Sequence, residues 1–529
     1  MRDKSGIECP QRAIFLYGAP ASGKSTLGKA LAERLGASFV DLDERIVAEA
    51  GISIPEIFKT RGEAAFRDIE SQVLRNVICA PDEKPSTLNF QLSTLKVVSL
   101  GGGTLLRDEN RALCEESGIV FCLDTPSDEE LARRIGAAPG SRPLGDKARE
   151  RAAHYASFPN RVAAFFDAQS SLVVVGRGIA PAILAGRNVV ADETVARFWA
   201  GRLGISPFAT IPSGEEHKTP ATVANLWHAF AGKGLGRKDA VVALGGGVTG
   251  DLTGFAAATW MRGISWINVP TTLLSMVDAS TGGKTGCDLP EGKNLAGAFH
   301  FPRLVVIDTD FLETLSPKLV ADGRAEMIKH EAIGGRSWSS ELELESGEGD
   351  FGWSKGSGVS AKGSGVRSWS SELELESGEG DFGWSKGSGV SAKEIAENLM
   401  VKVGIVREDP LETLGRRILL NCGHTVAHAI EKATRYRVSH GEAVAIGCVE
   451  EAKIAVRRGL APASWPEEFA ARFAAANLPT SLPDGLSLDE LVPLMRGDKK
   501  REGGAVTFAL PCGWGDVRGV KIDLSKECL

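Results

Sequence analysis

The chain has 529 residues, of which 43% are hydrophobic and 24% are charged. This length exceeds what one hydrophobic core organises, so it predicts two or three globular domains. The net charge of −7 disfavours a general binder of nucleic acid or of anionic membranes, and no apolar run is long enough to span a membrane.

The first third of the chain alternates between short apolar runs and helical patterns. An apolar run at residues 13–17 leads into a glycine loop and an amphipathic stretch at 25–35, which predicts strand, loop and helix. Further short strands are expected at 39–40, 97–100 and 119–123. This alternation is typical of a three-layer α/β/α domain, in which helices cover a parallel sheet.

A second series of strands and helices begins near residues 172–175 and includes a strand at 240–244. From residue 316 onward the pattern is mainly helical, with a weak strand signal at 505–510. We therefore expect three domains. They are an α/β/α domain at 1–168, a Rossmann-like α/β domain at 169–321 and a mainly helical domain at 322–529.

One region of the helical part breaks the pattern. Residues 336–362 recur letter for letter at 367–393. Solenoid repeats diverge and come in larger numbers, and this segment is rich in Gly, Ser and Glu, so it predicts a low-complexity insert at 336–393. Whether the insert inactivates the domain that carries it stays open.

Residues 18–25 match the phosphate-binding loop G-x-x-x-x-G-K-[ST] in full, after a predicted strand and before a predicted helix. In such a loop the backbone N–H groups surround a phosphate, Lys24 reaches the outer phosphates and the Ser25 hydroxyl ligates Mg²⁺. The loop therefore predicts a site for ATP with Mg²⁺. The expected nucleotide contacts are Gly18, Ser22, Gly23, Lys24, Ser25 and Thr26.

Two acidic residues, Asp41 and Asp43, follow the next predicted strand, close to where ligands collect in such sheets. A carboxylate there can accept the proton of an attacking hydroxyl group. Further along come, in order, Arg67, Gly101, Gly102, Gly103, Arg142 and Arg151. This ordered set resembles the shikimate kinase family over roughly residues 12–167.

The resemblance implies catalytic roles for Lys24 and Asp43. It implies that shikimate is held by Asp43, Arg67, Gly101, Gly102, Gly103 and Arg151, and that Arg142 meets the transferred phosphate from a lid. A guanidinium group suits a carboxylate because its fork is bidentate and always charged. The lid between Arg142 and Arg151 is shorter than the family pattern, so a nucleotide-binding module without catalysis stays open as an alternative.

The second half offers a glycine turn and a set of metal ligands. Residues 245–251 form a turn that can bring backbone N–H groups against a dinucleotide. Residues 324–330, 421–428 and 439–442 supply a carboxylate and well-separated imidazoles, a ligand set that suits a catalytic zinc with an open position. With the segments 213–218, 270–274, 278–285 and 292–295, they resemble the 3-dehydroquinate synthase family over about 170–333 and 394–523.

This second resemblance implies NAD⁺ and a divalent metal, zinc or cobalt, as cofactors. The implied reaction converts 3-deoxy-D-arabino-heptulosonate 7-phosphate to 3-dehydroquinate and phosphate, with NAD⁺ regenerated in each cycle. The metal would be held by Glu326, His424 and His440. NAD⁺ would contact Ser213, Gly214, Glu215, Glu216, His217, Lys218, Gly247, Val248, Thr249, Gly250, Asp251, Thr271, Thr272, Lys293, Phe311, Leu312, Glu313 and Thr314.

The same resemblance implies an anionic substrate held by Asp278, Lys284, Lys402 and Lys500, with Lys499 as a competitor for the last role. It implies catalytic roles for Lys284, Lys329, Arg417, Asn421 and His428. His428 lies one helical turn from His424, so both can face one cavity. His330, one turn after Glu326, is expected beside the metal ligands rather than among them.

Together these patterns predict a bifunctional enzyme of the shikimate pathway. An alternative is a sugar-phosphate cyclase or polyol dehydrogenase on the same scaffold, with a non-catalytic kinase-like module. The expected partners are small molecules, with no nucleic acid or membrane and with a possible homodimer through the second half. Nine cysteines without a Cys-x-x-Cys pair, and a start without an apolar signal segment, predict a reduced cytoplasmic protein.

Overall fold

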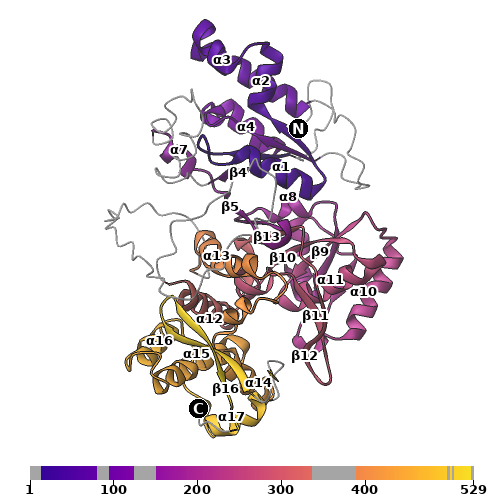
Figure 1. Cartoon of the computed structure of the whole chain (residues 1–529). Coiled ribbons are helices and arrows are strands. Elements are labelled where there is room, and N and C mark those ends of the chain that lie inside the picture. The colour runs from indigo at the N-terminus through magenta and orange to yellow at the C-terminus, as the bar shows by residue number, and fades with distance from the viewer. Residues whose placement is uncertain are drawn as a thin grey trace.

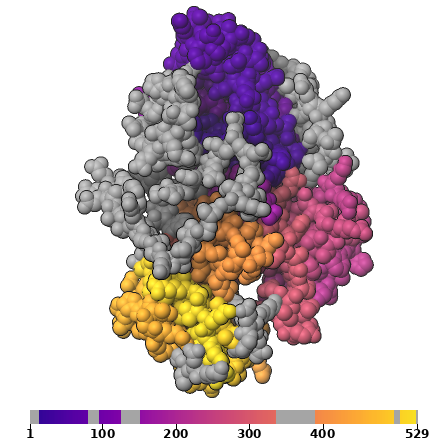
Figure 2. Space-filling model, in the orientation of Figure 1, coloured from indigo at the N-terminus to yellow at the C-terminus, as the bar shows by residue number. Residues whose placement is uncertain are grey.

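The computed structural model describes residues 13–79, 95–123, 150–335, 389–496, 501–502 and 505–525. It has the expected α/β class with a helical C-terminal region (Figure 1). We refer to residues 13–166 as the N-terminal part, 167–315 as the central part and 316–525 as the C-terminal part. In the space-filling view the N-terminal part lies at the top and the C-terminal part at the bottom (Figure 2).

The N-terminal part is a parallel sheet with helices packed against it. Each short apolar run that predicted a strand does form one, because parallel strands covered by helices bury both faces. The strands are β1 (Ala13–Tyr17), β2 (Ser38–Asp41), β3 (Lys96–Ser99), β4 (Gly118–Leu123) and β5 (Arg161–Phe166). The helices are α1 (Lys24–Leu35), α2 (Leu42–Ala50), α3 (Ile54–Cys79), α4 (Asp108–Ser117) and the short α7 (Ala152–Ala156).

The central part is a second, mostly parallel sheet with its own helices. Its sheet strands are β6 (Leu172–Gly176), β7 (Asn188–Asp192), β8 (Ala209–Ile211), β9 (Ala240–Gly245), β10 (Ser265–Pro270) and β13 (Leu304–Asp308). A separate hairpin consists of β11 (Lys284–Leu289) and β12 (Gly292–Phe299). The helices are α8 (Ala180–Leu184), α9 (Glu193–Leu203), α10 (Pro220–Lys233) and α11 (Gly247–Thr259), with helical turns η3 (Glu215–His217), η5 (Ser275–Ala279) and η6 (Thr309–Thr314).

The two sheets are joined edge to edge into one sheet of 11 strands, in the order β2-β3-β1-β4-β5-β6-β13-β10-β9-β7-β8. Strand β5 makes the joint, because it pairs in parallel with β4 on one side and antiparallel with β6 on the other. A single buried cluster contains side chains from both parts, among them Leu31, Val174 and Ile307. The N-terminal and central parts therefore share one sheet and one buried cluster, and each has a further cluster of its own.

A second contact between these parts lies at the end of α1. Arg187 and Arg303, both from the central part, donate to the carbonyl oxygens of Leu35 and Glu33 at 3.0 and 2.6 Å. The last carbonyls of a helix have no partner within the helix, so these arginines satisfy them. The helix that starts at the phosphate-binding loop thus ends on the central part.

The C-terminal part is mainly helical and has a separate core. Its elements are α12 (Pro317–Gly334), α13 (Ala392–Glu408), the turn η7 (Arg416–Asn421), α14 (His424–Ala433), α15 (His440–Arg457), α16 (Trp465–Ala474), α17 (Leu488–Met495) and a small antiparallel sheet of β14 (Arg501–Glu502), β15 (Ala505–Gly513) and β16 (Asp516–Ile522). The weak strand signal at 505–510 is therefore confirmed. Within the described residues, no helix combines the length and the apolar character that crossing a membrane requires.

The predicted low-complexity insert extends too far at its C-terminal end. Ser391, in the second copy of the repeat, caps α13, and its backbone and hydroxyl group both bond to Glu394 in a capping box. Ala392 and Lys393 are already helical, because Glu394 follows the repeat and completes the cap. Residues 336–388 lie outside the described residues.

Candidate functional sites

The phosphate-binding loop connects β1 to α1, as its sequence predicts. Gly18 and Gly23 have φ values of +137° and +90°, which side chains other than glycine rarely adopt. The Lys24 ammonium donates to the carbonyl oxygens of Gly18 and Ala19 at 3.1 and 2.7 Å. Burial lowers the pKa of Lys24 to about 8, although the charges of Asp43 and Asp41 act in the opposite direction. Of the remaining predicted nucleotide contacts, Ser22 is buried and Thr26 is exposed.

Ser25, the predicted Mg²⁺ ligand, donates to the Asp41 carboxylate at 2.6 Å. Asp41 ends β2 and caps α2 by accepting from the backbone N–H groups of Asp43 and Glu44. A serine hydroxyl beside a carboxylate gives two oxygen donors of the kind that Mg²⁺ prefers. Asp41 was named with Asp43 as a strand-end acid, but its place against Ser25 was not anticipated.

The glycine turn at 101–103 draws the predicted shikimate residues together. A Cβ atom on Gly101 would lie 3.1 Å from Asp43 Oδ1, and one on Gly103 would lie 2.5 Å from Arg67 Nη2 and 2.9 Å from Arg151 Nη1. A side chain at either position would therefore push against these groups. Arg151 also donates to the Gly102 carbonyl oxygen at 3.1 Å.

Two residues that the sequence did not single out hold this cluster. Glu70 is buried, accepts from Arg67 at 2.6 Å and from the Thr104 hydroxyl at 2.7 Å, and so fixes the guanidinium. Tyr155 donates its hydroxyl hydrogen to the Gly102 carbonyl oxygen at 2.7 Å. Arg142 lies outside the described residues, so its predicted role in the lid stays a prediction.

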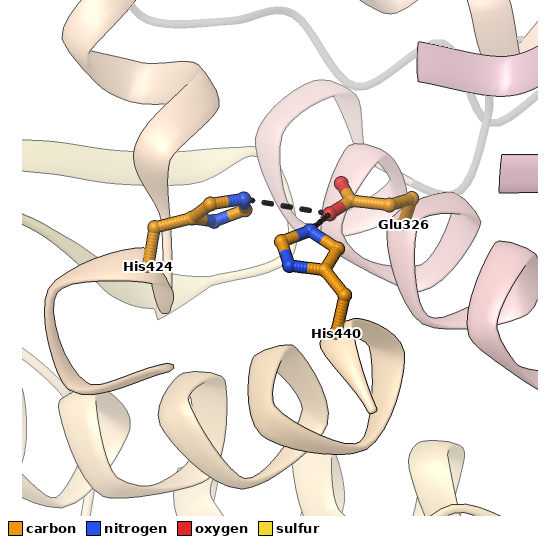
Figure 3. Close-up of side chains that lie close together, drawn as sticks. All are labelled: Glu326, His424 and His440. Carbon is orange, nitrogen blue, oxygen red and sulfur yellow. Dashed lines mark hydrogen bonds and ion pairs between the residues drawn. The ribbon is translucent and has the colours of Figure 1, made fainter. Parts of the chain in front are cut away.

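The predicted metal ligands meet in the C-terminal part, on three different helices (Figure 3). Glu326 Oε1 lies 3.2 Å from His440 Nε2 and 3.5 Å from His424 Nε2. One ligand atom from each of the three residues lies within 4.8 Å of the others. One carboxylate and two imidazole nitrogens at this spacing fit a divalent metal such as zinc.

The far nitrogen of each histidine is already bonded, which turns Nε2 toward the shared site. His424 Nδ1 donates to the Cys422 carbonyl oxygen at 3.0 Å, and His440 Nδ1 lies 3.4 Å from Glu431 Oε1. Such support is typical of histidines that bind metals. Burial lowers the pKa of His424 to about 3. Burial also opposes protonation of His440, but its bonds to Glu326 and Glu431 raise its pKa to about 10.

Glu451 is a further supporting residue that the sequence did not reveal. It is fully buried on α15 and accepts from the backbone N–H groups of Gly423, Thr425 and Val426 at 2.9, 3.1 and 3.3 Å. These groups are at the start of α14, where N–H groups lack partners within the helix. A negative charge there is favourable, so Glu451 fixes the turn from which His424 projects.

A network of buried charges adjoins the metal ligands. Lys329, one turn after Glu326 on α12, forms an ion pair with it, and Lys402 on α13 lies 2.8 Å from Asp278 Oδ1. Burial alone would lower the pKa of Lys329, but Glu326 raises it above its usual range. Burial alone would raise the pKa of Asp278, but Lys402 and Lys329 hold it well below its usual range.

His330 belongs to this network rather than to the three ligands. Its Nδ1 lies 2.9 Å from Asn398 Oδ1, and its Nε2 lies 3.8 Å from Asp278 Oδ1. Asp278, Glu326 and His330 also have metal-ligand spacing. Lys329 and Lys402 already neutralise the two carboxylates, which makes this second trio the poorer metal site.

The remaining predicted substrate residues divide into buried and exposed ones. Arg417 is 3% exposed and donates to the carbonyl oxygens of Gly282 and Pro410. His428 lies beside His424, with 5.5 Å between the ring centroids, and Asn421 ends η7 just before the ligand helix. Lys284, by contrast, is 54% exposed and lies 2.6 Å from Glu412. Lys499 and Lys500 lie outside the described residues.

The predicted NAD⁺ segments come together at the carboxyl ends of β7, β9 and β10. A Cβ atom on Gly245 would lie 3.0 Å from Asp192 Cβ, and one on Gly246 would lie 3.3 Å from Thr272 Cγ2. Ser213 donates to Asp192 Oδ1 at 2.8 Å. The α11 helix starts at Gly247, and its free N–H groups suit a pyrophosphate. Residues 248–251 form the first turn of the same helix, and Thr271 follows β10.

Asp192 is an acidic residue at the end of a strand next to the glycine turn. That position is where dinucleotide-binding sheets place a carboxylate for a ribose hydroxyl. No sequence motif singles out Asp192. The available signal was its place at the end of an apolar run in the same α/β series.

Lysines link the NAD⁺ segments to the other elements. Lys218 is buried and lies 2.6 Å from Asp251 Oδ2. Lys293 lies 3.3 Å from Glu215 Oε1 in the central part and 3.7 Å from Glu431 Oε1 in the C-terminal part. Glu431 also meets His440, so Lys293 connects the predicted cofactor segment to the metal ligands.

The segment 311–314 is less accessible than the prediction assumed. Phe311 and Leu312 are 1% and 2% exposed, and their side chains pack in the core. The Thr314 hydroxyl accepts from the Trp199 indole at 2.9 Å, and Glu313 lies 3.2 Å from Arg177. In the other predicted segment, Glu216 is exposed and His217 is half-buried.

Fold and sites define a phosphate-loop kinase joined to an enzyme that combines a dinucleotide turn with a divalent-metal site. Residues 20–183 match the family model for shikimate kinase. Residues 208–322 and 384–501 match the models for the N-terminal and C-terminal regions of 3-dehydroquinate synthase.

Curated relatives agree with these matches. The chain is 41% identical over 309 residues to a 3-dehydroquinate synthase of Synechococcus sp., covering 58% of this chain and 75% of that protein. It is 40% identical over 321 residues to the 3-dehydroquinate synthase of Symbiobacterium thermophilum, covering 60% of this chain and 80% of that protein. The chain belongs to the 3-dehydroquinate synthase family and carries a shikimate kinase domain ahead of the synthase. It is a bifunctional shikimate-pathway enzyme, both a kinase and a phosphate-eliminating lyase.

A solved structure shares the synthase fold. It is a 2-deoxy-scyllo-inosose synthase complexed with carbaglucose-6-phosphate, NAD⁺ and Co²⁺. Its TM-score is 0.52 at 24% identity, and the match covers 69% of this chain and 97% of that one. At this identity the likeness supports the fold alone.

Proposed function

We propose that the chain phosphorylates shikimate with ATP and, separately, converts 3-deoxy-D-arabino-heptulosonate 7-phosphate to 3-dehydroquinate and phosphate. The observation that carries the synthase half is the trio Glu326, His424 and His440, with buried cations beside it. The observation that carries the kinase half is the phosphate-binding loop beside the cluster around Gly101–Gly103.

In the synthase, Glu326, His424 and His440 would hold zinc or cobalt, which supplies a Lewis acid for an alcohol or carbonyl oxygen. NAD⁺, held against the glycine turn and Asp192, would supply a reversible hydride acceptor. Lys329 stays protonated beside Glu326 and places a positive charge where oxyanions gather. Asp278 accepts from a substrate hydroxyl group, and Lys402 and Arg417 bind the carboxylate and phosphate of the substrate.

His428 is the proposed proton carrier of the synthase. Its ring lies beside His424 and one helical turn further along α14, so it reaches the same cavity without ligating the metal. We propose that Lys284 and Lys500 bind the anionic substrate at the edge of the site.

In the kinase, ATP with Mg²⁺ would supply the transferable phosphoryl group. Arg67 and Arg151 bind the carboxylate of shikimate, and the Asp43 carboxylate takes the proton of the attacking hydroxyl group. Asp41 orients Ser25 toward the metal by accepting its hydroxyl hydrogen.

We further propose domain limits at residues 1–168, 169–321 and 322–529, a homodimer through the synthase, and a cytoplasmic location. The last is supported by the cysteines of the described residues, which form no disulfide there: Cys79, Cys114, Cys122, Cys287, Cys422, Cys448 and Cys512.

The deciding experiment measures both activities in one preparation. Phosphate release from 3-deoxy-D-arabino-heptulosonate 7-phosphate should require NAD⁺, stop on chelation and return with zinc. ADP formation should depend on shikimate. Absence of phosphate release from folded, zinc-supplied protein, or turnover of sedoheptulose 7-phosphate in its place, would overturn the synthase assignment. ATP hydrolysis indifferent to shikimate would overturn the kinase assignment.

A further inference from the structure

The turn that follows the shared strand β5 reaches into the synthase half. Asp167 comes directly after β5, and its side chain is 3% exposed. Its Oδ1 accepts from the Ala168 N–H group at 2.7 Å, and its Oδ2 accepts from the Gly282 N–H group at 2.9 Å. Both carboxylate oxygens are therefore occupied, and one of them holds a residue more than a hundred positions away in the chain.

Gly282 lies in the loop between η5 and β11, between the predicted substrate residues Asp278 and Lys284. Its φ of +88° is a conformation that other residues rarely adopt. Its carbonyl oxygen accepts from Arg417 at 3.0 Å, and a Cβ atom on Gly282 would lie 2.6 Å from Arg417 Nη2. One peptide group of this loop is thus held by Asp167, and the next by Arg417.

Arg417 is itself incompletely bonded. Its Nε is buried and has no hydrogen-bond partner within the described residues. A buried guanidinium donor without a partner is costly, which an anionic ligand would relieve. A second hydrogen bond connects the end of β5 to α13, because Arg407, on the same helix as Lys402, donates to the carbonyl oxygen of Phe166 at 2.8 Å.

We infer that Asp167 is a positioning residue for the synthase, which sets Gly282 and, through it, the Arg417 guanidinium for the phosphate-bearing substrate. The inference rests on the proposed synthase function. It makes the turn after a strand of the kinase sheet part of the synthase site. Burial raises the pKa of Asp167, while its bonds to the Gly282 and Ala168 N–H groups and the nearby cations Lys402 and Arg417 act in the opposite direction.

The test compares Asp167→Ala with Asp239→Ala in the full-length, zinc-loaded protein. Asp239 is the matched control, since its carboxylate also accepts from a glycine N–H group, that of Gly236 at 2.7 Å, but on an exposed turn. We expect Asp167→Ala to raise the synthase KM for the sugar phosphate about tenfold with little change in kcat, since a buried donor loses its acceptor. Asp239→Ala should leave KM unchanged, and shikimate kinase kinetics should be unchanged in both variants.

Three results would overturn the inference while the wild-type synthase is active. They are an unchanged KM in Asp167→Ala, a fall in kcat without a rise in KM, and a parallel loss of synthase and kinase activity with a lower Tm. If Asp167→Ala does not fold, Asp167→Leu decides, because leucine keeps the branched shape of the side chain and offers no acceptor to Gly282: a raised KM supports the inference and an unchanged KM overturns it. A wild-type protein without phosphate release would instead overturn the proposed function itself.

Discussion

Two lysines, one in each active region, have pKa values that are shifted in opposite directions. In the N-terminal part, the half-buried Lys24 donates to backbone carbonyl oxygens, and burial lowers its pKa to about 8. In the C-terminal part, Lys329 is 1% exposed and contacts Glu326, and its pKa is raised above the usual range although burial alone would lower it. The pKa of a lysine therefore depends on the carboxylates around it as well as on its burial.

The difference reflects how each site is built. The phosphate-binding loop is one continuous segment whose permanent partners are backbone groups, so its lysine gains full charge compensation only from a ligand. The synthase site gathers side chains from α12, α13, α14 and α15, and its charges already compensate one another. A single substitution in the phosphate-binding loop should therefore affect only its immediate contacts. A single substitution in the synthase site should also affect the other charged side chains of the network.

The largest expected effect is the loss of Glu326. Glu326→Gln removes a metal ligand and leaves Lys329 without its partner, so we expect phosphate release to fall by about a thousandfold or more. Bound zinc, measured by atomic absorption after dialysis, should fall in parallel, while shikimate-dependent ADP formation persists. Retained zinc with full synthase activity would show that the ligand assignment is wrong.

The corresponding change in the kinase is Lys24→Ala. Removing the charge that meets the outer phosphates should lower kcat/KM for shikimate phosphorylation by about 10²–10³-fold. Synthase activity should stay within the error of the assay, because within the described residues the two sites share a sheet but no charged group. A matching loss of phosphate release would break the contrast between a local and a network site.

A smaller effect is expected from Glu451→Gln, which weakens the cap on the helix that presents His424. Zinc affinity, measured by competition with a chelator, should fall by about 10–100-fold, as for other groups that orient metal ligands. Glu450→Gln is the matched control, because Glu450 is the neighbouring residue on α15 and pairs with Lys453 at 2.7 Å instead. Equal affinities in the two variants would count against the role of Glu451.

The smallest expected effect is a pH dependence of MgATP affinity that arises from the lowered pKa of Lys24. Nucleotide phosphates attract the protonated form of Lys24, so MgATP affinity should be greatest below pH 8 and weaken above it, by at most about tenfold per pH unit for one proton. Lys24→Arg should remove this inflection, since guanidinium stays charged. Calorimetric titration between pH 7 and 9.5 measures it. An inflection of the same size in Lys24→Arg would assign the proton to another group.

The parts that the sequence predicted are those in which one segment carries the whole signal. The phosphate-binding loop, the apolar strands and the helix at 25–35 are of this kind, because periodicity and turn chemistry act over neighbouring residues. The three metal ligands are far apart in the chain and were placed by family resemblance. In the structure these three side chains lie close together, which agrees with that resemblance.

What the sequence did not predict consists of single polar residues whose partners are distant. Glu431, Glu451 and Asp192 belong to no motif, and each acquires a role only when folding brings another segment against it. The same holds for residues 161–166. Their apolar character is compatible with a strand, but nothing in it specifies that the strand pairs on both sides.

That pairing sets an order of events during synthesis. Strands β1 to β4 and then β5 leave the ribosome first, and β6 follows within one short turn. The edge of β6 that faces away from β5, however, stays unpaired until β13 is made, after almost all of the central part. An open edge in a nascent chain invites pairing with foreign strands. During the interval between the synthesis of β6 and that of β13, the nascent chain therefore has an unpaired strand edge.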